Sequence, residues 1–502
     1  MAKDNTFNFI FNRFYQGASP TAHLSNLTSF GNAGHYSVAS NIDVVSNPDC
    51  ITQGPTLSTL TSGDQDGAVG GASTVDELIN FIMDKAVADD ETYGIGVTKL
   101  FKISSTEVAS GGSPSWPQAI TSCADGQSVI DLKGNLYGFY NKSSGGDILK
   151  MPIATEVIDP NWGSDTGEDG PTGAAALQEA IHPVAAKEDL MLFGNGKYLG
   201  VYTDETTTIE PTKLDFGNGT EVADIIFHAN QWWIVVNSGV SGTNRTIGHI
   251  YLYDGAATTT LLSDETSVGV QRIGFLYALN GIVYVAYQDL SSSGGFQIGY
   301  IFGRQIKPLV YFTGTLPTFA QKTLYKNTIL FISSGSIYSA GAIIGKLPFQ
   351  ISQLADGGHA TIGGLAAPFG TPMVASTDGI SKYKIAKFSG YDTTACNWKS
   401  IIIPLVSSRA IGYIDEVVVL TKTLAGGDGE EARCDLLLEY NQGSSNSGTA
   451  KQITGTGSRR FVFGFGSGPI EDFRVYLNWA EGNVTNDCPI REIQVNGHFV
   501  ER

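Results

Sequence analysis

Six times in the middle of the chain, a tight polar turn leads directly into an apolar, β-rich stretch. The turns lie 35 to 60 residues apart with a mean of 47, and a period of about 40 to 50 residues built from short strands is typical of β-propeller blades. The copies are Lys133-Gly134-Asn135 before LYGFY, Gly194-Asn195-Gly196-Lys197 before YLGVY, Ala229-Asn230-Gln231 before WWIVV, Leu279-Asn280-Gly281 before IVYVAY, Lys326-Asn327-Thr328 before ILFIS, and Phe369-Gly370-Thr371 before PMVAS. The sequence therefore predicts an all-β propeller, which favours a display or assembly scaffold over a compact enzyme.

Within each repeat, the apolar strand is followed by a polar turn and a second strand, as at 147–150, 250–254 and 298–301. Such a pair reads as a hairpin in the middle of a blade. The first blade is expected to start near Tyr93, and an insertion at 159–180 accounts for the longest interval. The repeats end near residue 392, which leaves room for six or seven blades.

The N-terminal part of the chain has a different character. Residues 1–36 are aromatic and polar by turns and then rich in Ser, Gly and Asn, so we expect an extended docking arm that packs on this chain or on a neighbour. The propeller is assigned to residues 37–392. Its first segment, 37–61, can supply one or two strands, and a terminal strand completes the last blade in many propellers.

One short helix is predicted near 73–88, as a lid or a packing element between domains. Ser73 and Thr74 stand three residues before Asp76 and Glu77, which is a capping-box pattern. An apolar stripe at helical spacing follows, made by Leu78, Ile79, Ile82, Met83 and Val87.

Beyond Tyr391 the period stops, and residues 393–502 carry clean strand alternation instead. In the last run Phe473, Val475, Leu477 and Trp479 share one face. Strands separated by Gly- and Ser-rich loops predict a C-terminal β-sandwich of the jelly-roll or immunoglobulin-like kind. The predicted strands are 399–405, 416–420, 434–440, 460–465 and 473–479.

Composition narrows the possible partners. The formal net charge of −18 repels phosphate backbones, so no sequence-specific nucleic-acid binding and no attraction to anionic membranes is expected. The N-terminus has no apolar signal segment, and no apolar run is long enough to span a membrane.

An odd number of cysteines without CxxC spacing predicts separate, half-buried thiols rather than a disulfide framework or a metal site. These cysteines are Cys50, Cys123, Cys396, Cys434 and Cys488.

No residue pattern marks a catalytic, cofactor-binding or metal site. GxSxG, HExxH and P-loop motifs are absent, and no two histidines stand at i, i+4 among His23, His35, His182, His228, His249, His359 and His498. Sialidase propellers carry repeated Ser-x-Asp-x-Gly turns, whereas here only 376–379 (STDG) comes close. A pair of glycosidase carboxylates is not ruled out among 49 acidic residues, but nothing marks one.

Two acidic loops and several tryptophans have both bland and functional interpretations. The loops at 64–67 and 165–170 resemble calcium sites, but Ala176 stands where an EF-hand needs a bidentate Glu, so solvated loops are expected. Trp232 and Trp233 must point to opposite faces of a strand, one into the core and the other between blades or toward a sugar. Trp116, Trp162 and Trp398 are expected to act as hydrophobic plugs near the rim.

The chain as a whole resembles tail-associated virion proteins of tailed bacteriophages. The resemblance rests on the order of an aromatic arm, a degenerate propeller and a final β-domain, and on three stretches: 398–405 (WKSIIIPL), 413–422, and the ending 490–497 (IREIQVNG). Podophage tail nozzles also use a propeller but are generally longer, with other inserted domains.

The resemblance implies a non-enzymatic structural component of the virion, made in the host cytoplasm. It would be a homo-oligomeric tail or tail-tip protein that contacts other tail or connector proteins and acts in assembly and host adsorption. Two alternatives stay open: a protein that binds a host carbohydrate or receptor, and a glycan-degrading propeller enzyme.

Overall fold

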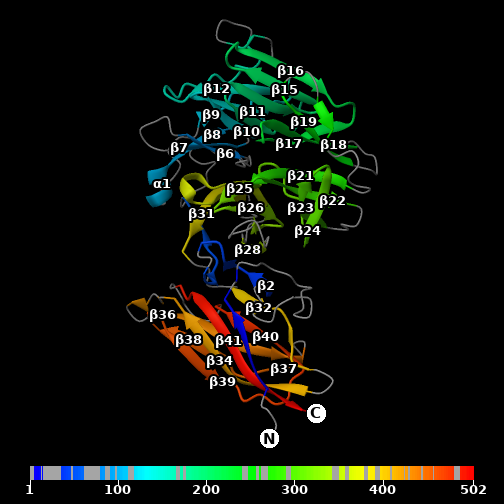
Figure 1. Ribbon diagram of the computed structural model, residues 1–502. Helices are drawn as coiled ribbons and strands as arrows, with labels where there is room; N and C mark the ends of the chain where they lie inside the picture. The colour runs from blue at the N-terminus through cyan, green and yellow to red at the C-terminus, as the bar shows by residue number, and fades with distance from the viewer. Residues whose placement is uncertain are drawn as a thin grey trace.

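The computed structural model shows two β-domains in one elongated molecule, with the propeller in the upper part of Figure 1 and the sandwich below it. The structure describes residues 5–12, 14, 36–46, 49–60, 80–84, 91–96, 99–110, 118–165, 170–172, 177–239, 247–255, 259–261, 270–289, 295–341, 350–356, 361–377, 383–390, 396–406, 410–422, 424, 426–427, 430–441, 445–455, 457–479 and 487–501.

Seven small antiparallel sheets in the described part of the chain form the blades of the propeller. In chain order they are β6–β9 (Asn80–Asp84, Glu91–Ile95, Lys99–Ser104, Gln118–Ala119), β10–β12 (Asp125–Leu132, Asn135–Asn141, Gly146–Pro152), β13–β16 (Val184–Lys187, Leu190–Asn195, Tyr198–Thr203, Thr208–Asp215), β17–β20 (Thr220–His228, Gln231–Ser238, Ile247–Tyr253, Thr259–Leu261), β21–β24 (Val270–Leu279, Ile282–Asp289, Gly295–Phe302, Gln305–Thr313), β25–β28 (Lys322–Tyr325, Thr328–Ser333, Ser336–Gly341, Gln350–Asp356), and β29–β31 with β5 (Thr361–Ala366, Met373–Thr377, Tyr383–Ser389, Thr56–Thr59).

The first strand of each blade lies innermost, and these strands follow one another around the ring. β10 contacts β6 and β13, β17 contacts β13 and β21, β21 contacts β26 of the next blade, β25 contacts β29, and β29 returns to β6. The ring is therefore closed, and apolar clusters fill the spaces between neighbouring blades. The prediction of a six- or seven-bladed propeller is confirmed, with seven blades.

The repeated turns join the first and second strands of their blades in five of the six cases. Each of these five has two consecutive residues with positive φ, such as Lys133 and Gly134 (48° and 78°) or Asn280 and Gly281 (53° and 77°). Two positive φ values define the type I′ turn, whose twist suits a two-residue hairpin. The exception is the third blade, where the expected turn at Asn195 joins the second strand to the third.

The described parts of the insertion, 159–165, 170–172 and 177–180, lie along the open edge of the second blade, which has three described strands. Isolated bridges join Lys150 to Asp159 and Gly146 to Leu177. Trp162 of this insertion is fully buried, with its ring 5.1 Å from Tyr137 and 5.2 Å from Tyr202. These parts of the insertion therefore pack against the edge of the second blade, where the buried Trp162 side chain holds them.

β5 is the outermost strand of the last blade, where it pairs with β31. The expected closure of the ring by an N-terminal strand is therefore confirmed. The predicted start of the propeller at residue 37 is wrong, because β2 (Tyr36–Ser40) pairs with β32 (Asn397–Ser400) in the C-terminal domain. The short hairpin β3 (Ile42–Asp43) and β4 (Thr52–Gln53) then leads from one domain to the other.

The C-terminal domain is a sandwich of two sheets that share one core. One sheet has the order β1, β41, β34, β39 (Asn5–Phe11, Ile490–Glu501, Ala410–Thr421, Arg460–Gly464). The other has the order β2, β32, β40, β36, β35, the last three being Asp472–Asn478, Glu430–Tyr440 and Gly426–Gly427, with β33 (Ile403–Pro404), β37 (Ser445–Asn446) and β38 (Lys451–Gly455) paired alongside. Four of the five strands predicted in this region are present, and the fifth, 399–405, is divided between the end of β32 and β33.

The aromatic N-terminal segment docks on its own chain. β1 pairs antiparallel with β41 over its whole length, from Asn5 opposite Phe499 to Phe11 opposite Ile493. Phe9, Phe11 and Phe14 are buried in the sandwich core. The described part of the arm is therefore an integral strand of the sandwich.

The predicted helix near 73–88 is wrong where the structure describes it, because residues 80–84 form strand β6, paired with β7. Residues 73–79 and 85–88 lie outside the described residues. Pairing in the first blade overrides a helical pattern that has only local support. The described chain does contain a short helix, α1 (Ser105–Ser110), and it begins with a true capping box: Glu107 N–H donates to Ser104 Oγ at 3.2 Å, and Ser104 N–H donates to Glu107 Oε2 at 2.7 Å.

Candidate functional site

The strongest candidate site is a cavity of about 420 Å³ within the propeller. Residues of the innermost strands form part of its lining. β10, β17, β21 and β29 each carry a β-bulge near their first residues. β21 carries two bulges, and one extra residue from each of the four strands lines the cavity: Gln127, Ala223, Gly274 and Gly363. A bulge inserts one unpaired residue and bends its strand, so the four bulges shape a common space inside the ring.

Two opposite charges from neighbouring blades face this cavity. Glu221 is the second residue of β17, and Arg272 is the third residue of β21. Burial raises the pKa of the Glu221 carboxyl, while the positive charge of Arg272 and a hydrogen bond from the backbone of Ile181 act in the opposite direction. Arg272 is exposed.

One wall of the cavity is the segment 316–321, which crosses from the fifth blade to the sixth. It lies directly against β21: a Cβ atom added at Gly274 would meet the carbonyl oxygen of Pro317 at 2.1 Å. Leu365 N–H of the seventh blade donates to the Ala320 carbonyl at 3.0 Å, and Thr318 N–H donates to Gln321 Oε1 at 3.1 Å. Ile332 N–H of the sixth blade donates to the Gln321 carbonyl at 3.1 Å, so the wall contacts the fifth, sixth and seventh blades.

A buried ion pair stabilises the same region of the ring. The Asp224 carboxylate in β17 accepts hydrogen bonds from Lys322 in β25 and from Leu276 N–H in β21, the latter at 2.7 Å. Lys322 also donates to the Leu276 carbonyl at 2.7 Å. This pair links blades four, five and six, and burial at a sheet junction indicates a structural role.

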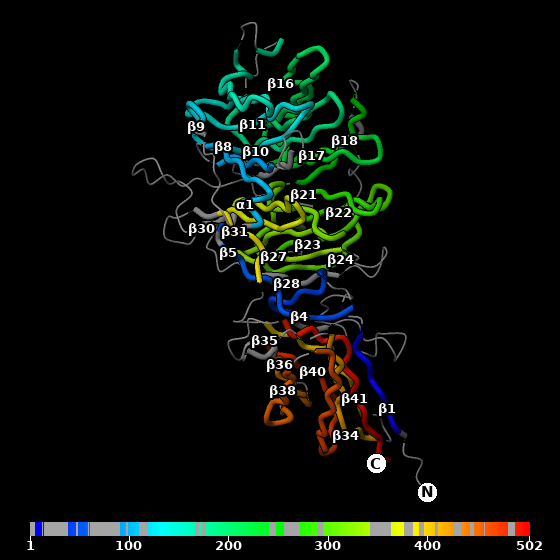
Figure 2. The backbone as a smooth tube through the Cα atoms, turned by 90° about the vertical axis from the view of Figure 1, so that its left-hand side faces the viewer, coloured from blue at the N-terminus to red at the C-terminus, as the bar shows by residue number. Residues whose placement is uncertain are grey.

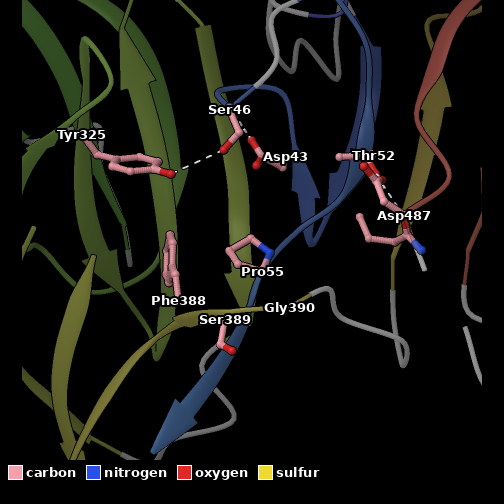
Figure 3. A pocket seen from close by; sticks show the side chains of 10 residues that line it. Asp43, Ser46, Thr52, Pro55, Tyr325, Phe388, Ser389, Gly390 and Asp487 are labelled. Atoms are coloured by element: carbon pink, nitrogen blue, oxygen red, sulfur yellow. Dashed lines mark hydrogen bonds between the residues drawn. The ribbon is translucent and has the colours of Figure 1, made fainter. Parts of the chain in front are cut away.

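A second cavity, of about 400 Å³, lies at the junction of the two domains (Figure 3). Both of its carboxylates accept hydrogen bonds from nearby groups: Thr52 donates to Asp487, and Asp43 accepts from the backbone N–H groups of Val45 and Ser46, both at 2.8 Å. The Ser46 hydroxyl lies 3.4 Å from the Tyr325 hydroxyl of the propeller. These contacts connect the two domains, so we assign this cavity to the interface between domains and not to a ligand site.

Trp162 is buried in the propeller as a hydrophobic plug, as predicted. The predicted place of Trp398 near the propeller rim is wrong, because Trp398 lies in β32 of the sandwich. Trp162, Trp232 and Trp398 are buried, and Trp233 is half-buried with its indole N–H donating to the His228 carbonyl at 3.2 Å. Trp116 lies outside the described residues. Trp398 packs edge-on against Phe11 and Phe14 in the sandwich.

The cysteines differ from expectation in their burial. All five are free thiols, but four are fully buried, and Cys396, Cys434 and Cys488 lie together in the sandwich core. The acidic loop 64–67, residues 166–169 of the second acidic loop, and Asp378 and Gly379 lie outside the described residues. Within the described ranges, no group of three or more His, Cys, Asp or Glu side chains is placed to hold a metal ion.

The placement of Glu221 and Arg272 on one cavity was not visible in the sequence. Both residues stand at the start of apolar strands, in TEVADIIF and VQRIGFLY, and these short segments do not show that the two residues line one cavity.

In the part of the chain that is described, no helix has the length and apolar character needed to cross a membrane.

No known protein family matches the chain, and no curated protein matches it. Among solved structures, it is similar to the extracellular domain of a hybrid two-component system from B. thetaiotaomicron (11% identity, TM-score 0.43, 80% of this chain and 47% of that one). Others are the extracellular domains 1-2 of Drosophila Semaphorin 1a (9%, 0.41, 66% and 88%) and the β-propeller domain of the Trilobed protease from Pyrococcus furiosus (9%, 0.39, 63% and 96%). The chain spans about half the length of the first of these structures, and the likenesses concern the fold alone.

Proposed function

We propose that this protein is a structural component of a bacteriophage virion: an oligomeric tail or tail-tip protein that acts in assembly and host adsorption. The observation that carries the proposal is the way in which the two domains are connected. The chain starts in the sandwich with β1 and β2, closes the propeller with β5, and returns to the sandwich with β32. The propeller is thus an insertion in the sandwich, attached by two covalent connections.

This double connection suits a protein that must carry load between two ends. The sandwich contacts the propeller at its rim, where β2 and β3 lie against β28 of the sixth blade. Blades two to four lie at the far end of the molecule from the sandwich (Figures 1 and 2). In a particle, the sandwich would attach to the tail and the propeller would be held outward.

Exposed apolar side chains supply surfaces that assembly would bury. On the outer hairpin of the fifth blade Phe302 is 69% exposed, and Leu309 and Tyr311 are also exposed. β24, which carries the last two, is the edge strand of its sheet. Exposed apolar side chains on and beside an edge strand are candidates for a contact site.

The experiment is mass photometry of the purified protein, alone and mixed with detached tails or tail-less particles. We expect a discrete oligomer that joins the particle. We expect Phe302→Glu to weaken the formation of this oligomer. Val157→Glu is the matched control, because Val157 is 68% exposed on the second blade. A monomer that joins no particle would contradict the proposal.

A second function, binding of a host carbohydrate or receptor, is favoured by the central cavity alone. It is compatible with the first, since adsorption proteins do both. The glycan-degrading alternative has no observation in its favour.

A further inference from the structure

The two charged groups of the central cavity offset each other. Glu221 and Arg272 face the same space and their formal charges sum to zero. An anionic ligand would gain from Arg272 but be repelled by Glu221, and a cationic ligand would meet the reverse. The cavity therefore favours a neutral ligand that can both donate and accept hydrogen bonds.

The remaining lining combines amides with apolar side chains. Gln127 and Gln321 bring amide groups, and Ile181, Leu316 and Phe319 bring apolar surface. The volume of about 420 Å³ falls within the range of small-molecule sites, about 300–1,000 Å³. Sugars are the class of neutral molecule that presents hydroxyl groups on its edges and C–H groups on its faces.

We propose that the central cavity binds a neutral saccharide residue. The Glu221 carboxylate accepts hydrogen bonds from two adjacent hydroxyl groups, and the Arg272 guanidinium donates to hydroxyl or ring oxygens. Leu316 and Phe319 contact the C–H face of the ring. This inference rests on the second proposed function, adsorption through a carbohydrate, and does not depend on the first.

The test is saturation-transfer difference NMR on the intact protein with maltose, cellobiose, lactose and chitobiose, and with sialyllactose and glucose 6-phosphate as anionic comparators. We expect at least one neutral sugar to bind and the anions to bind more weakly. Hydrogen bonds to charged groups are stronger than those between neutral groups, so Glu221→Gln and Arg272→Ala should each weaken binding by about tenfold or more. Glu210→Gln is the matched control, because Glu210 is an exposed carboxylate on β16 paired with Lys213.

Thermal unfolding of each variant separates loss of binding from loss of fold. The proposal is overturned if no neutral sugar binds the wild-type protein, if only the anions bind, or if Glu221→Gln and Arg272→Ala fold normally and bind as tightly as wild type. Entry of the wild-type protein into particles is measured separately by mass photometry. Failure of sugar binding therefore leaves the assembly role standing, and failure of assembly leaves the sugar site standing.

Discussion

The propeller and the sandwich are built from the same kind of strand but from opposite kinds of contact. Among the described strands of each propeller blade, every strand pairs with the next one along the chain, and β5 alone comes from a distant position. In the sandwich, the first described strand pairs with the last, so that Asn5 lies opposite Phe499. The propeller is a series of local hairpins, while the sandwich forms only when both ends of the chain have met, at a higher entropic cost of closure.

The largest expected effect comes from removing residues 2–14. This deletion takes Phe9, Phe11 and Phe14 out of the sandwich core and exposes the edge of β41. Each lost phenylalanine costs about 3–5 kcal/mol, a combined loss on the order of 10 kcal/mol. Differential scanning calorimetry should show the sandwich transition lost and the propeller transition kept.

The control for this deletion is Asn8→Ala, which changes an exposed side chain of the same strand and should shift stability by no more than about 0.5 kcal/mol. If the deletion also removes the propeller transition, the two domains unfold as one unit, and the contrast between them fails at the level of stability.

The second prediction concerns the ion pair that links three blades. Lys322→Met leaves the Asp224 carboxylate buried without its cation, and breaking a buried pair in this way costs about 3–5 kcal/mol. Replacing both partners, Asp224→Asn with Lys322→Met, should recover part of that loss. Urea unfolding should place the whole effect in the propeller transition. Equal losses in the single and double variants would show that the charges themselves contribute little.

What the sequence revealed follows the same contrast between local and distant contacts. The turns were readable because a type I′ hairpin needs positive φ at two adjacent positions, and pairs such as Asn280-Gly281 supply it. The closing strand followed from the propeller prediction itself. The pairing of β1 with β41 was not readable, because nothing in an aromatic segment says which distant strand it will meet.

The prediction of a helix near 73–88 was wrong, and the residues of the central cavity were not predicted, for related reasons. The pattern from Ser73 to Val87 satisfies local rules for a helix, yet residues 80–84 pair with β7, so a tertiary contact decided the outcome. Glu221 and Arg272 come together only because four bulges and the ring place them there. Sequence reasoning therefore gave the frame of the site and none of its residues.

The third prediction uses pH to probe the propeller alone. His182 is fully buried, with Nδ1 2.8 Å from the Gly194 carbonyl and Nε2 3.2 Å from Asn141 Oδ1, and burial lowers its pKa to about 4. The folded protein therefore binds fewer protons than the unfolded chain between about pH 6.5 and pH 4. The stability that neutral His182 contributes is complete above pH 6.5 and is lost as pH falls through this window, by roughly 3 kcal/mol.

Urea unfolding at several pH values should show this slope in the wild-type propeller transition and a smaller slope in His182→Gln. His228→Gln, a change of another propeller histidine, should keep the wild-type slope. An unchanged slope in His182→Gln would mean that water reaches the imidazole and that the interface between blades two and three is open.

The smallest effect is expected at a clamp between blades four and five. The Asn237 amide donates to the Ile273 carbonyl and accepts from the Ile273 N–H, both at 2.9 Å. Asn141 makes the same pair of bonds with the backbone of Ala180 between blades two and three, at 3.1 and 3.3 Å. Both asparagines stand near the end of the second strand of their blade, so the repeat carries a side-chain clamp in addition to its turns.

Asn237→Ala leaves two buried backbone groups without partners and should cost about 2 kcal/mol in the propeller transition, measured by urea unfolding. Asn218→Ala, in an exposed turn where Asn218 accepts a hydrogen bond from Lys197, should change stability by less than about 0.5 kcal/mol. Since this clamp connects successive blades, contacts between neighbours in the chain stabilise the ring as well as each hairpin. If Asn237→Ala costs no more than Asn218→Ala, the two Asn237 hydrogen bonds contribute no net stability to the contact between blades four and five.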